Sequence, residues 1–429
     1  MSAPSAIDRL RRGWCPGTLR PMETGDGWLV RLHPPGGRLS PEQLRRVAAL
    51  ARAHGSGLVE ISARANLQIR GVTADSHPRL VQALLAERLV DEHDGDGPQR
   101  LALISPLAGT ERCATDAVAL AGAIEAAARP LRGLPAKLGI VLDDGGPLSL
   151  EAFPADIRLR ATVPAEIRLG LPAGLWFGPV TAEDAPGTVA GLLSGFLAHH
   201  RQRPGAVRRF RDLSRDALVA LASEAGLQET VPPPKRPLPR RVGSFAWGEA
   251  GRAVVIGLPF GRCDAETLDR LAAACGPDAD IRFSPWRGIA FRGLRDARAA
   301  TLLSLARELG LVTEDADPRL SVQACAGAPA CKSAQAPAMT DAARLAEAVP
   351  DLLAAGMSLH VSGCIKGCAH PGPADLTLVA EDGRYRVIAG GTARESGGEA
   401  LDLPTLLARL QPGEELHARL SAARRGMNG

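Results

Sequence analysis

Two pairs of cysteines in the C-terminal third of the chain have the residue type and spacing to hold an iron–sulfur cluster. Cys325 and Cys331 form a C-x5-C pair, and after a gap of 32 residues Cys364 and Cys368 form a C-x3-C pair. Sets of four cysteine thiolates bind 4Fe–4S clusters. Structural zinc usually takes C-x2–4-C pairs, so the wider first pair argues against it. The pattern favours a 4Fe–4S site, with zinc, disulfides or ordinary buried cysteines as the alternatives.

A second candidate binding element lies in the N-terminal half, where apolar and polar side chains alternate over residues 59–71. A strand with this period turns its apolar residues to one face and its polar residues to the other. Arginines on such a face would suit the carboxylates of a large anionic ligand, although a solvated strand face is a common alternative. The predicted polar face comprises Ser62, Arg64, Asn66, Gln68 and Arg70.

The rare lysines of this chain give a weaker signal. Of 51 lysines and arginines, only four are lysines. Lys332 and Lys366 lie beside or within the cysteine pairs, Lys137 lies in a Leu-Pro-Ala-Lys-Leu-Gly segment, and Lys235 lies in a proline-rich stretch. A lysine kept where arginine is the usual cation hints at a need for a compact ammonium group.

The elements that must position these residues are predicted to be duplicated. Residues 231–241 contain so much proline that they favour a semi-rigid linker over a helix or a central strand. On the two sides of this linker, residues 59–71 and 281–293 align without a gap, and both segments end in Arg-Gly. An internal duplication explains this match better than a chance similarity of two α/β segments.

Each copy is predicted to contain a strand, then a helix capped by Ser40 or Asp264, and then the aligned segment. A second α/β module follows each copy. In the later module, residues 320–323 and 357–361 are predicted strands that lead into the two cysteine pairs, and Pro350 should kink or divide the helix between them. The corresponding loop of the earlier module, residues 104–109, has no cysteine. The predicted boundaries are 1–85 and 242–297 for the half-repeats, 86–230 and 298–429 for the modules, and 231–241 for the linker.

Composition narrows the class of protein. The chain has 429 residues with 45% hydrophobic and 23% charged residues, which is ordinary for a globular protein with several domains. The net charge of +4 gives no argument for nucleic acid. We expect no membrane span and no signal peptide, and a cytoplasmic location in reducing surroundings. Four cysteines lack ligand spacing and are expected to be ordinary residues: Cys15, Cys113, Cys263 and Cys275.

Taken together, these residues resemble the sulfite and nitrite reductase superfamily. Its cysteine pattern is C-x5-C followed by C-x3-C, and its half-repeats carry a Thr-x-Arg-x-x-x-Gln motif that Ser62, Arg64 and Gln68 match. The resemblance implies an α+β fold with a duplicated sulfite/nitrite-reductase-like architecture: two ferredoxin-like half-repeats plus two α/β cluster-type modules. It also implies a 4Fe–4S cluster whose last ligand, here Cys368, is shared with the iron of sirohaem in the reductases.

Two departures make the chain resemble the precorrin-3B synthase branch of that superfamily. The reductases place Lys-x-Lys over a small oxyanion, whereas this chain keeps Lys137 and has Gly139 at the second position. Their second cysteine pair usually reads Cys-Pro-Asn-x-Cys, whereas this chain has Cys364-Ile-Lys-Gly-Cys368. Residues 15–22, 134–139 and 362–371 also resemble the branch.

The branch implies a monooxygenase of aerobic cobalamin biosynthesis. Precorrin-3A, O2 and electrons from NADH would give precorrin-3B through hydroxylation at C20 and formation of a lactone. The chain has no G-x-G-x-x-G motif, so the electrons would come from a separate NADH-dependent reductase. A mononuclear non-haem iron is a further candidate cofactor, with His360 and His370 as weak candidate ligands. The resemblance assigns Arg64 and Lys137 as catalytic and tetrapyrrole-binding residues, and adds as substrate-binding residues Asn66, Gln68, Arg70 and Lys366.

Two other hypotheses remain open at this point. The first is a sirohaem-dependent sulfite or nitrite reductase, and the second is a non-catalytic electron carrier. A visible absorption spectrum separates them, because sirohaem has strong visible bands and a cluster alone gives a broad shoulder.

Overall fold

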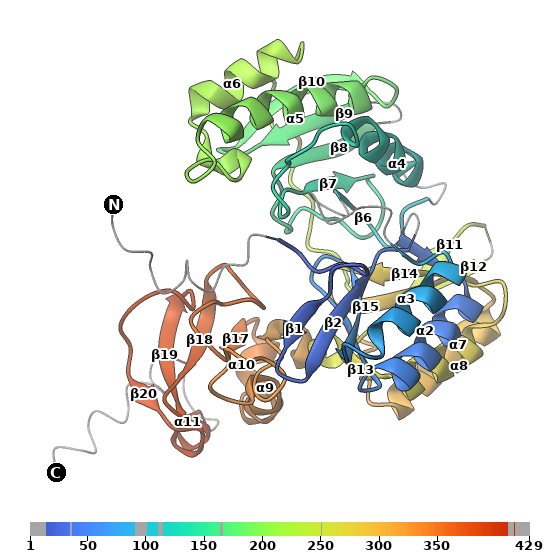
Figure 1. The fold of residues 1–429 in the computed structure, drawn as a ribbon, viewed down its shortest axis with the longest axis vertical. Coiled ribbons are helices and arrows are strands. Elements are labelled where there is room, and N and C mark those ends of the chain that lie inside the picture. Colours follow the sequence, from blue (N-terminus) through green and yellow to red (C-terminus); the bar gives the residue numbers. More distant parts are fainter. Residues whose placement is uncertain are drawn as a thin grey trace.

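The described part of the chain is organised by four five-stranded sheets (Figure 1). This computed structural model describes residues 14–34, 37–90, 101–109, 115–163, 166–249, 251–410 and 416. Two expectations lie outside the described residues: the absence of a signal peptide in residues 1–13, and the ordinary role of Cys113. Helices and strands alternate in mixed α+β order, as the resemblance predicts.

Two antiparallel sheets form the half-repeats, and each sheet takes its last strand from the other copy. The first sheet has the order β1 (Met22–Thr24), β2 (Gly27–Leu32), β5 (Leu67–Val72), β4 (Leu58–Ile61) and β13 (Arg262–Asp264). The second has the order β11 (Gly243–Trp247), β12 (Gly251–Gly257), β15 (Gly288–Leu294), β14 (Asp280–Ser284) and β3 (Arg38–Leu39). Because β13 pairs with β4 and β3 pairs with β14, the two copies are joined by main-chain hydrogen bonds. The sequence did not reveal this exchange.

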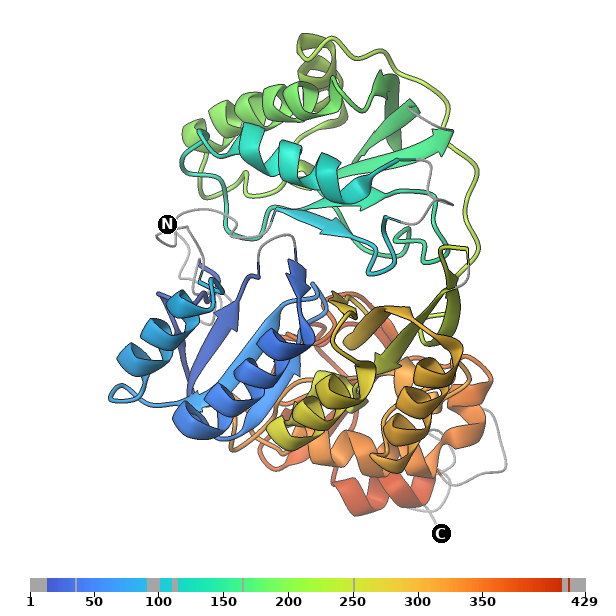
Figure 2. The ribbon, with the colours of Figure 1, turned by 90° about the vertical axis from the view of Figure 1, so that its right-hand side faces the viewer.

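The helices of the two half-repeats lie side by side and cover the sheets (Figure 2). α2 (Pro41–His54) begins at Ser40, whose hydroxyl accepts from the Gln43 N–H, and α7 (Ala265–Cys275) begins at Asp264, whose carboxylate accepts from the Thr267 N–H. Both predicted caps are therefore confirmed. α3 (His77–Ala86) and α8 (Asp296–Glu308) complete the layer. Leu44, Val47, Leu268 and Leu271 are among the residues of the shared apolar core.

The prediction of one continuous strand over residues 59–71 was wrong. β4 ends at Ile61 and β5 begins at Leu67, with a tight turn between them. The Ser62 hydroxyl accepts from the Arg64 and Asn66 N–H groups, and Ala65 takes a left-handed backbone with φ 55°. Serine hydroxyls compete for backbone donors in this way and favour turns over ladders. The aligned segment of the second copy turns at the equivalent position, where Arg287 has φ 59°.

The two α/β modules share one strand order. The earlier sheet is β6 (Ala102–Ile104), β7 (Ile140–Asp143), β8 (Ile157–Val163), β9 (Glu166–Leu171) and β10 (Leu175–Thr181); the later is β16 (Val322–Ala324), β17 (Leu359–Ser362), β18 (Ala374–Glu381), β19 (Arg384–Gly391) and β20 (Ala400–Leu401). In both sheets the first two pairings are parallel and the last two are antiparallel. The duplication therefore extends to the modules.

Helices pack against both module sheets. The earlier module has α4 (Ala117–Ala128), α5 (Ala185–Gln202), the short helix η2 (Phe210–Asp212) and α6 (Arg215–Glu224). The later half has η3 (Pro259–Gly261), η4 (Pro318–Ser321), α9 (Ala338–Ala348), α10 (Pro350–Ala354) and α11 (Leu403–Arg409). Pro350 divides α9 from α10, as predicted, because its ring cannot continue the preceding helix.

The proline-rich linker has no regular structure and runs along the earlier module. The Arg160 guanidinium donates to the Pro234 carbonyl, and Arg236 donates to Asp143 at the end of β7. The domain boundaries drawn from the sequence stay predictions. Within the described residues, no helix is both long and apolar enough to span a membrane.

Candidate functional site

The two cysteine pairs meet at one edge of the later module. β16 and β17 are parallel neighbours in which Ala324 lies opposite Val361. Cys325 follows β16 directly, its N–H donating to the Val361 carbonyl, and Cys364 follows β17 after one residue. The carboxyl ends of parallel strands lie at the same edge of a sheet, and this brings the two cysteine loops together.

The four thiols at this edge suit a 4Fe–4S cluster. All four are free, and each of Cys325, Cys364 and Cys368 is influenced electrostatically by other members of the set. The Gly363 N–H donates to the Cys325 sulfur at 3.1 Å, a contact that stabilises a thiolate. Burial raises the pKa of the Cys325 and Cys364 thiols, so metal binding must displace their protons. In the part of the chain that is described, no three Cys, His, Asp or Glu side chains are placed to hold a single metal ion. A cubane spaces its ligands more widely than a single ion.

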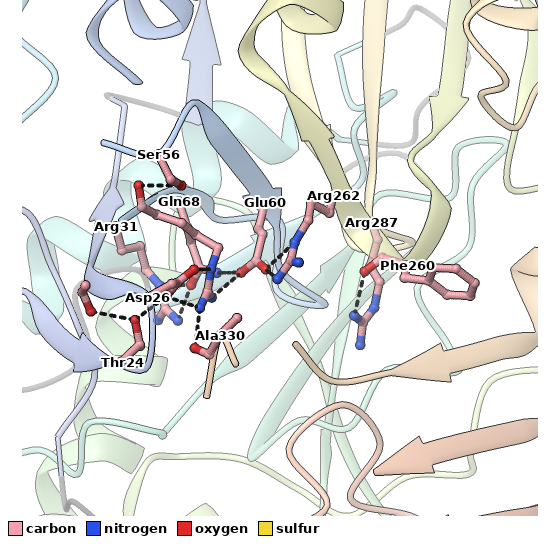
Figure 3. Close-up of polar contacts among 12 residues, drawn as sticks. Thr24, Asp26, Arg31, Ser56, Glu60, Gln68, Phe260, Arg262, Arg287 and Ala330 are labelled. Atoms are coloured by element: carbon pink, nitrogen blue, oxygen red, sulfur yellow. Dashed lines mark hydrogen bonds and ion pairs between the residues drawn. The ribbon is translucent and has the colours of Figure 1, made fainter. Parts of the chain in front are cut away.

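A buried ion network fastens the first cysteine loop (Figure 3). The Arg70 side chain is 3% exposed and donates to Asp26 at 2.7 Å, to Glu60 at 3.1 Å and to the carbonyl of Ala330 at 2.7 Å. Ala330 immediately precedes Cys331. Burial alone would raise the pKa of Asp26, but hydrogen bonds from Arg70 and Thr24 hold it below its ordinary value.

This network corrects the predicted polar face. Within β5, Leu67 and Ile69 enter the core while Gln68 and Arg70 point away from it, so the alternation holds only there. The Gln68 amide oxygen accepts from Arg31 at 2.7 Å, and its amino group donates to Glu60 at 3.3 Å. Asn66, Gln68 and Arg70 are all buried, whereas Arg64 is exposed in the turn. The structure therefore does not bring these residues together on one open strand face.

Arg64 lies instead over the Lys137 segment. Its Nη2 donates to the Lys137 carbonyl at 3.1 Å. A Cβ atom built on Gly139 would come within 2.6 Å of the same Nη2, so only glycine leaves room for the guanidinium in this position. The glycine that replaces the second lysine of the reductase pattern is thus what admits Arg64.

A buried carboxylate holds the backbone of the Lys137–Gly139 segment in place. Asp156 is 2% exposed and accepts from the Gly139 N–H at 2.9 Å, from the Arg209 guanidinium at 2.7 Å and from the Phe210 N–H at 3.1 Å. Asp156 and Arg209 therefore fix the backbone on which Arg64 rests.

The basic residues and the last cysteine form one electrostatic site. Partial burial lowers the pKa of Lys137, and the charges of Cys15, Lys366 and Cys368 act on the same ammonium group. Cys368 is exposed, while Cys364 is buried. The charges of Lys137 and Lys366 beside the exposed Cys368 thiol suit an anionic ligand.

The two candidate iron ligands are placed differently. His360 lies on β17, fully buried, and neither of its ring nitrogens has a hydrogen-bond partner. Burial lowers the pKa of His360 to about 4, with the charges of His370 and Arg287 adding to the shift. The His370 ring is 5.7 Å from that of His360 and contacts the Pro373 carbonyl at 3.0 Å. Their role as ligands of a mononuclear iron stays a prediction.

Sequence reasoning missed three residues at this site. Cys15 was expected to be ordinary, but its thiol donates to the Ala136 carbonyl at 3.5 Å, beside Lys137. Asp156 has no motif signal at all. Arg287 was visible only as the residue aligned with Ala65, and its role depends on a contact with a distant loop. Cys263 and Cys275 are buried, as ordinary small residues would be.

Comparisons with known proteins identify relatives of this chain. A model of the nitrite/sulfite reductase ferredoxin-like half domain matches residues 20–87 and 248–309, which are the two half-repeats. A precorrin-3B synthase from Sinorhizobium sp. is 35% identical over 90% of this chain and 84% of its own length. A ferredoxin–nitrite reductase from Synechococcus elongatus is 24% identical over 84% of this chain and 77% of its own. The solved structure of the NirA protein of Mycobacterium tuberculosis shares the fold, with a TM-score of 0.72 and 20% identity over 92% of this chain and 83% of that one.

Proposed function

The chain belongs to the precorrin-3B synthases, within the nitrite and sulfite reductase superfamily, and on that premise we propose that it converts precorrin-3A to precorrin-3B. The observation that carries the proposal is the replacement at Gly139. One cation of a small-oxyanion site is absent there, and the guanidinium of Arg64 occupies the space. Such a site favours a large polycarboxylate over a small doubly charged anion.

The residues of the site have distinct proposed roles. Arg64, Lys137 and Lys366 would bind the peripheral carboxylates of the tetrapyrrole, because all three are cations close to one another and to Cys368. Asp156 and Arg209 would hold the Lys137–Gly139 backbone in place. Arg70, Gln68 and Asn66 are buried, and we assign them to positioning the cysteine loop and the turn.

The cysteines Cys325, Cys331, Cys364 and Cys368 would hold a 4Fe–4S cluster. When bound, such a cluster supplies single electrons, and here they would serve oxygen activation. We infer that O2 is the second substrate and that a separate NADH-dependent reductase delivers the electrons. The free thiols also suit a reducing compartment, so we assign the chain to the cytoplasm.

The test combines a spectrum with a turnover assay. Anaerobically purified protein should contain iron and sulfide but no stoichiometric sirohaem. Supplied with a reductant, it should consume O2 only when precorrin-3A is present, and mass spectrometry should find one added oxygen atom in the product. Sulfite and nitrite should be poor substrates, because losing one stabilising donor typically costs about 10²–10³ in rate.

A sirohaem-dependent sulfite or nitrite reductase is the second candidate. It is favoured by the exposed Cys368 thiol beside Lys137, which could be shared with a haem iron. One sirohaem per chain together with rapid turnover of sulfite or nitrite would replace the first proposal by the second.

A further inference from the structure

Each cysteine loop is fastened by an arginine from a different half-repeat. Arg70, from β5 of the first, donates to the carbonyl of Ala330, one residue before Cys331. Arg287, from the β14–β15 turn of the second, donates to the carbonyl of Ala369 at 2.9 Å, one residue after Cys368. Figure 3 shows Arg287 in its own contact with Phe260, whose carbonyl accepts at 3.3 Å.

The two arginines differ in how their charge is balanced. Arg70 is paired with the carboxylates of Asp26 and Glu60. Arg287 donates only to carbonyl groups, and among the described residues no carboxylate lies within ion-pair distance of it. Its Nε is buried without a hydrogen-bond partner. The charges of Glu60 and Cys325 act on Arg287, but neither group is within ion-pair distance of it. A largely enclosed cation without a directly paired carboxylate is costly, so this position suits an anion.

His360 gives an independent sign of the same missing group. Its ring is completely buried, and both nitrogens lack protein partners, which native proteins rarely tolerate without an ordered water, a bound ion or a ligand. The ring lies against the second cysteine loop, since a Cβ built on Gly367 would be 3.7 Å from its Cε1 atom. The charge of Arg287, which donates to the same loop at Ala369, also acts on His360.

We propose that Arg287 and His360 are positioning residues that set the reduction potential of the iron–sulfur cluster, Arg287 by balancing its charge and His360 by donating an N–H toward it. The proposal rests on the proposed function, in that it requires the four cysteines to hold a cluster. With its thiolates, the cluster is the anion that Arg287 lacks, and a nearby N–H of His360 would donate toward it.

The physical consequence is a higher potential. Reduction adds one negative charge to the cluster, and a fixed positive charge nearby stabilises the reduced form. Net charge and hydrogen bonds to the sulfurs are the levers that set such potentials. Across roughly 10 Å of protein, one unit charge shifts a one-electron equilibrium by about tenfold.

The experiment measures the midpoint potential of the full-length protein, reconstituted anaerobically and titrated with dithionite while EPR reports the reduced cluster. Arg287→Gln removes the charge but keeps an amide donor, and Arg287→Lys keeps the charge. His360→Phe removes both ring nitrogens from the buried site. Lys332→Gln is the matched control, because Lys332 also adjoins a cluster cysteine but is exposed and paired with Glu23.

At a fixed potential, Arg287→Gln should lower the ratio of reduced to oxidised cluster by about tenfold, and Arg287→Lys should restore most of it. His360→Phe should lower the ratio by a smaller factor, and Lys332→Gln should leave it unchanged. Equal ratios in wild type, Arg287→Gln and His360→Phe, all with full iron content, would overturn the proposal. If Arg287→Gln fails to load a cluster, the other two variants still test the proposal. The ratio of reduced to oxidised cluster should stay close to wild type in Arg287→Lys and should fall in His360→Phe. A wild-type protein without any cluster would instead remove the proposed function on which this inference rests.

Discussion

The contact between Arg64 and Gly139 is the most direct test of the substrate site. In Gly139→Ala, the new Cβ would lie 2.6 Å from Nη2 and 3.1 Å from Cζ of Arg64. Real atoms do not approach so closely, so one group must move. The group in the way is the end of a flexible, exposed side chain, and we therefore expect the guanidinium to swing away from the Lys137 carbonyl while the fold stays intact.

The expected effect is on binding and not on stability. Arg64 is exposed, so the free energy of unfolding should change by less than about 1 kcal/mol. A displaced guanidinium loses a charge-assisted contact with a substrate carboxylate, which is worth about 1.5–3 kcal/mol. The Kd for precorrin-3A, measured by anaerobic absorbance titration, should therefore rise about ten- to a hundredfold.

A double-mutant cycle identifies the route of this effect. Once Arg64→Ala has removed the guanidinium, adding Gly139→Ala should change Kd by no more than about twofold. Gly122→Ala is the matched control, because Gly122 is exposed on α4 with no atom within 4 Å of a built Cβ. If Gly139→Ala weakens binding as much without Arg64 as with it, the proposed contact is not what sets affinity.

Three further predictions follow from the cysteine edge. A serine substitution at any one of the four cluster cysteines should lower the content of iron and acid-labile sulfide, whereas Cys275→Ser should keep both. The four cysteines are Cys325, Cys331, Cys364 and Cys368. The pKa of Asp26 is held low by its hydrogen bonds, so its contribution to stability is present above about pH 4 and is lost as pH falls through the lowered value. Asp26→Asn should accordingly cost about 1–3 kcal/mol in urea unfolding at neutral pH, with a smaller further loss in acid than wild type shows. Because burial raises the thiol pKa values, reconstitution of the apoprotein followed by absorbance should give more cluster at about pH 8.5 than at about pH 7.

The architecture could be predicted from the sequence because its signals are local or repeated. The capping residues Ser40 and Asp264 mark their helices within a few positions, and Pro350 marks a break by its own chemistry. The gapless alignment of the two copies predicts the duplication. The cysteine spacing identifies the candidate ligand set without any knowledge of the fold.

The details of the site could not be predicted, because they depend on contacts between distant segments. Period-2 alternation across Ser62–Asn66 resembles a strand, but side-chain hydrogen bonds to the backbone produce a turn there. Nothing in the sequence around Arg70 shows that Asp26 and Ala330 use its donors. The exchange of β3 and β13 between sheets is likewise invisible, since each segment is only two or three residues long.

The duplicated scaffold also explains how one edge can hold a cofactor while its counterpart does not. Arg70 and Arg292 occupy matching positions in the two copies. Arg70 donates to Ala330 in the loop after β16, and Arg292 donates to Ala108 in the loop after β6. An equivalent arginine therefore donates to the corresponding loop of each module, whether or not that loop contains cysteines.

What differs is the group that fills the edge. In the earlier module, β7 ends at the buried Asp143, which accepts from Arg236 of the linker, from the Ser149 hydroxyl and from the Leu150 N–H. Asp143 is thus satisfied by an ion pair inside the protein. At the matching end of β17 the chain presents thiols, and Arg287 and His360 behind them have unsatisfied groups. The asymmetry suggests that the later edge is completed by a bound anion, and the potentials of the Arg287 and His360 variants test that conclusion directly.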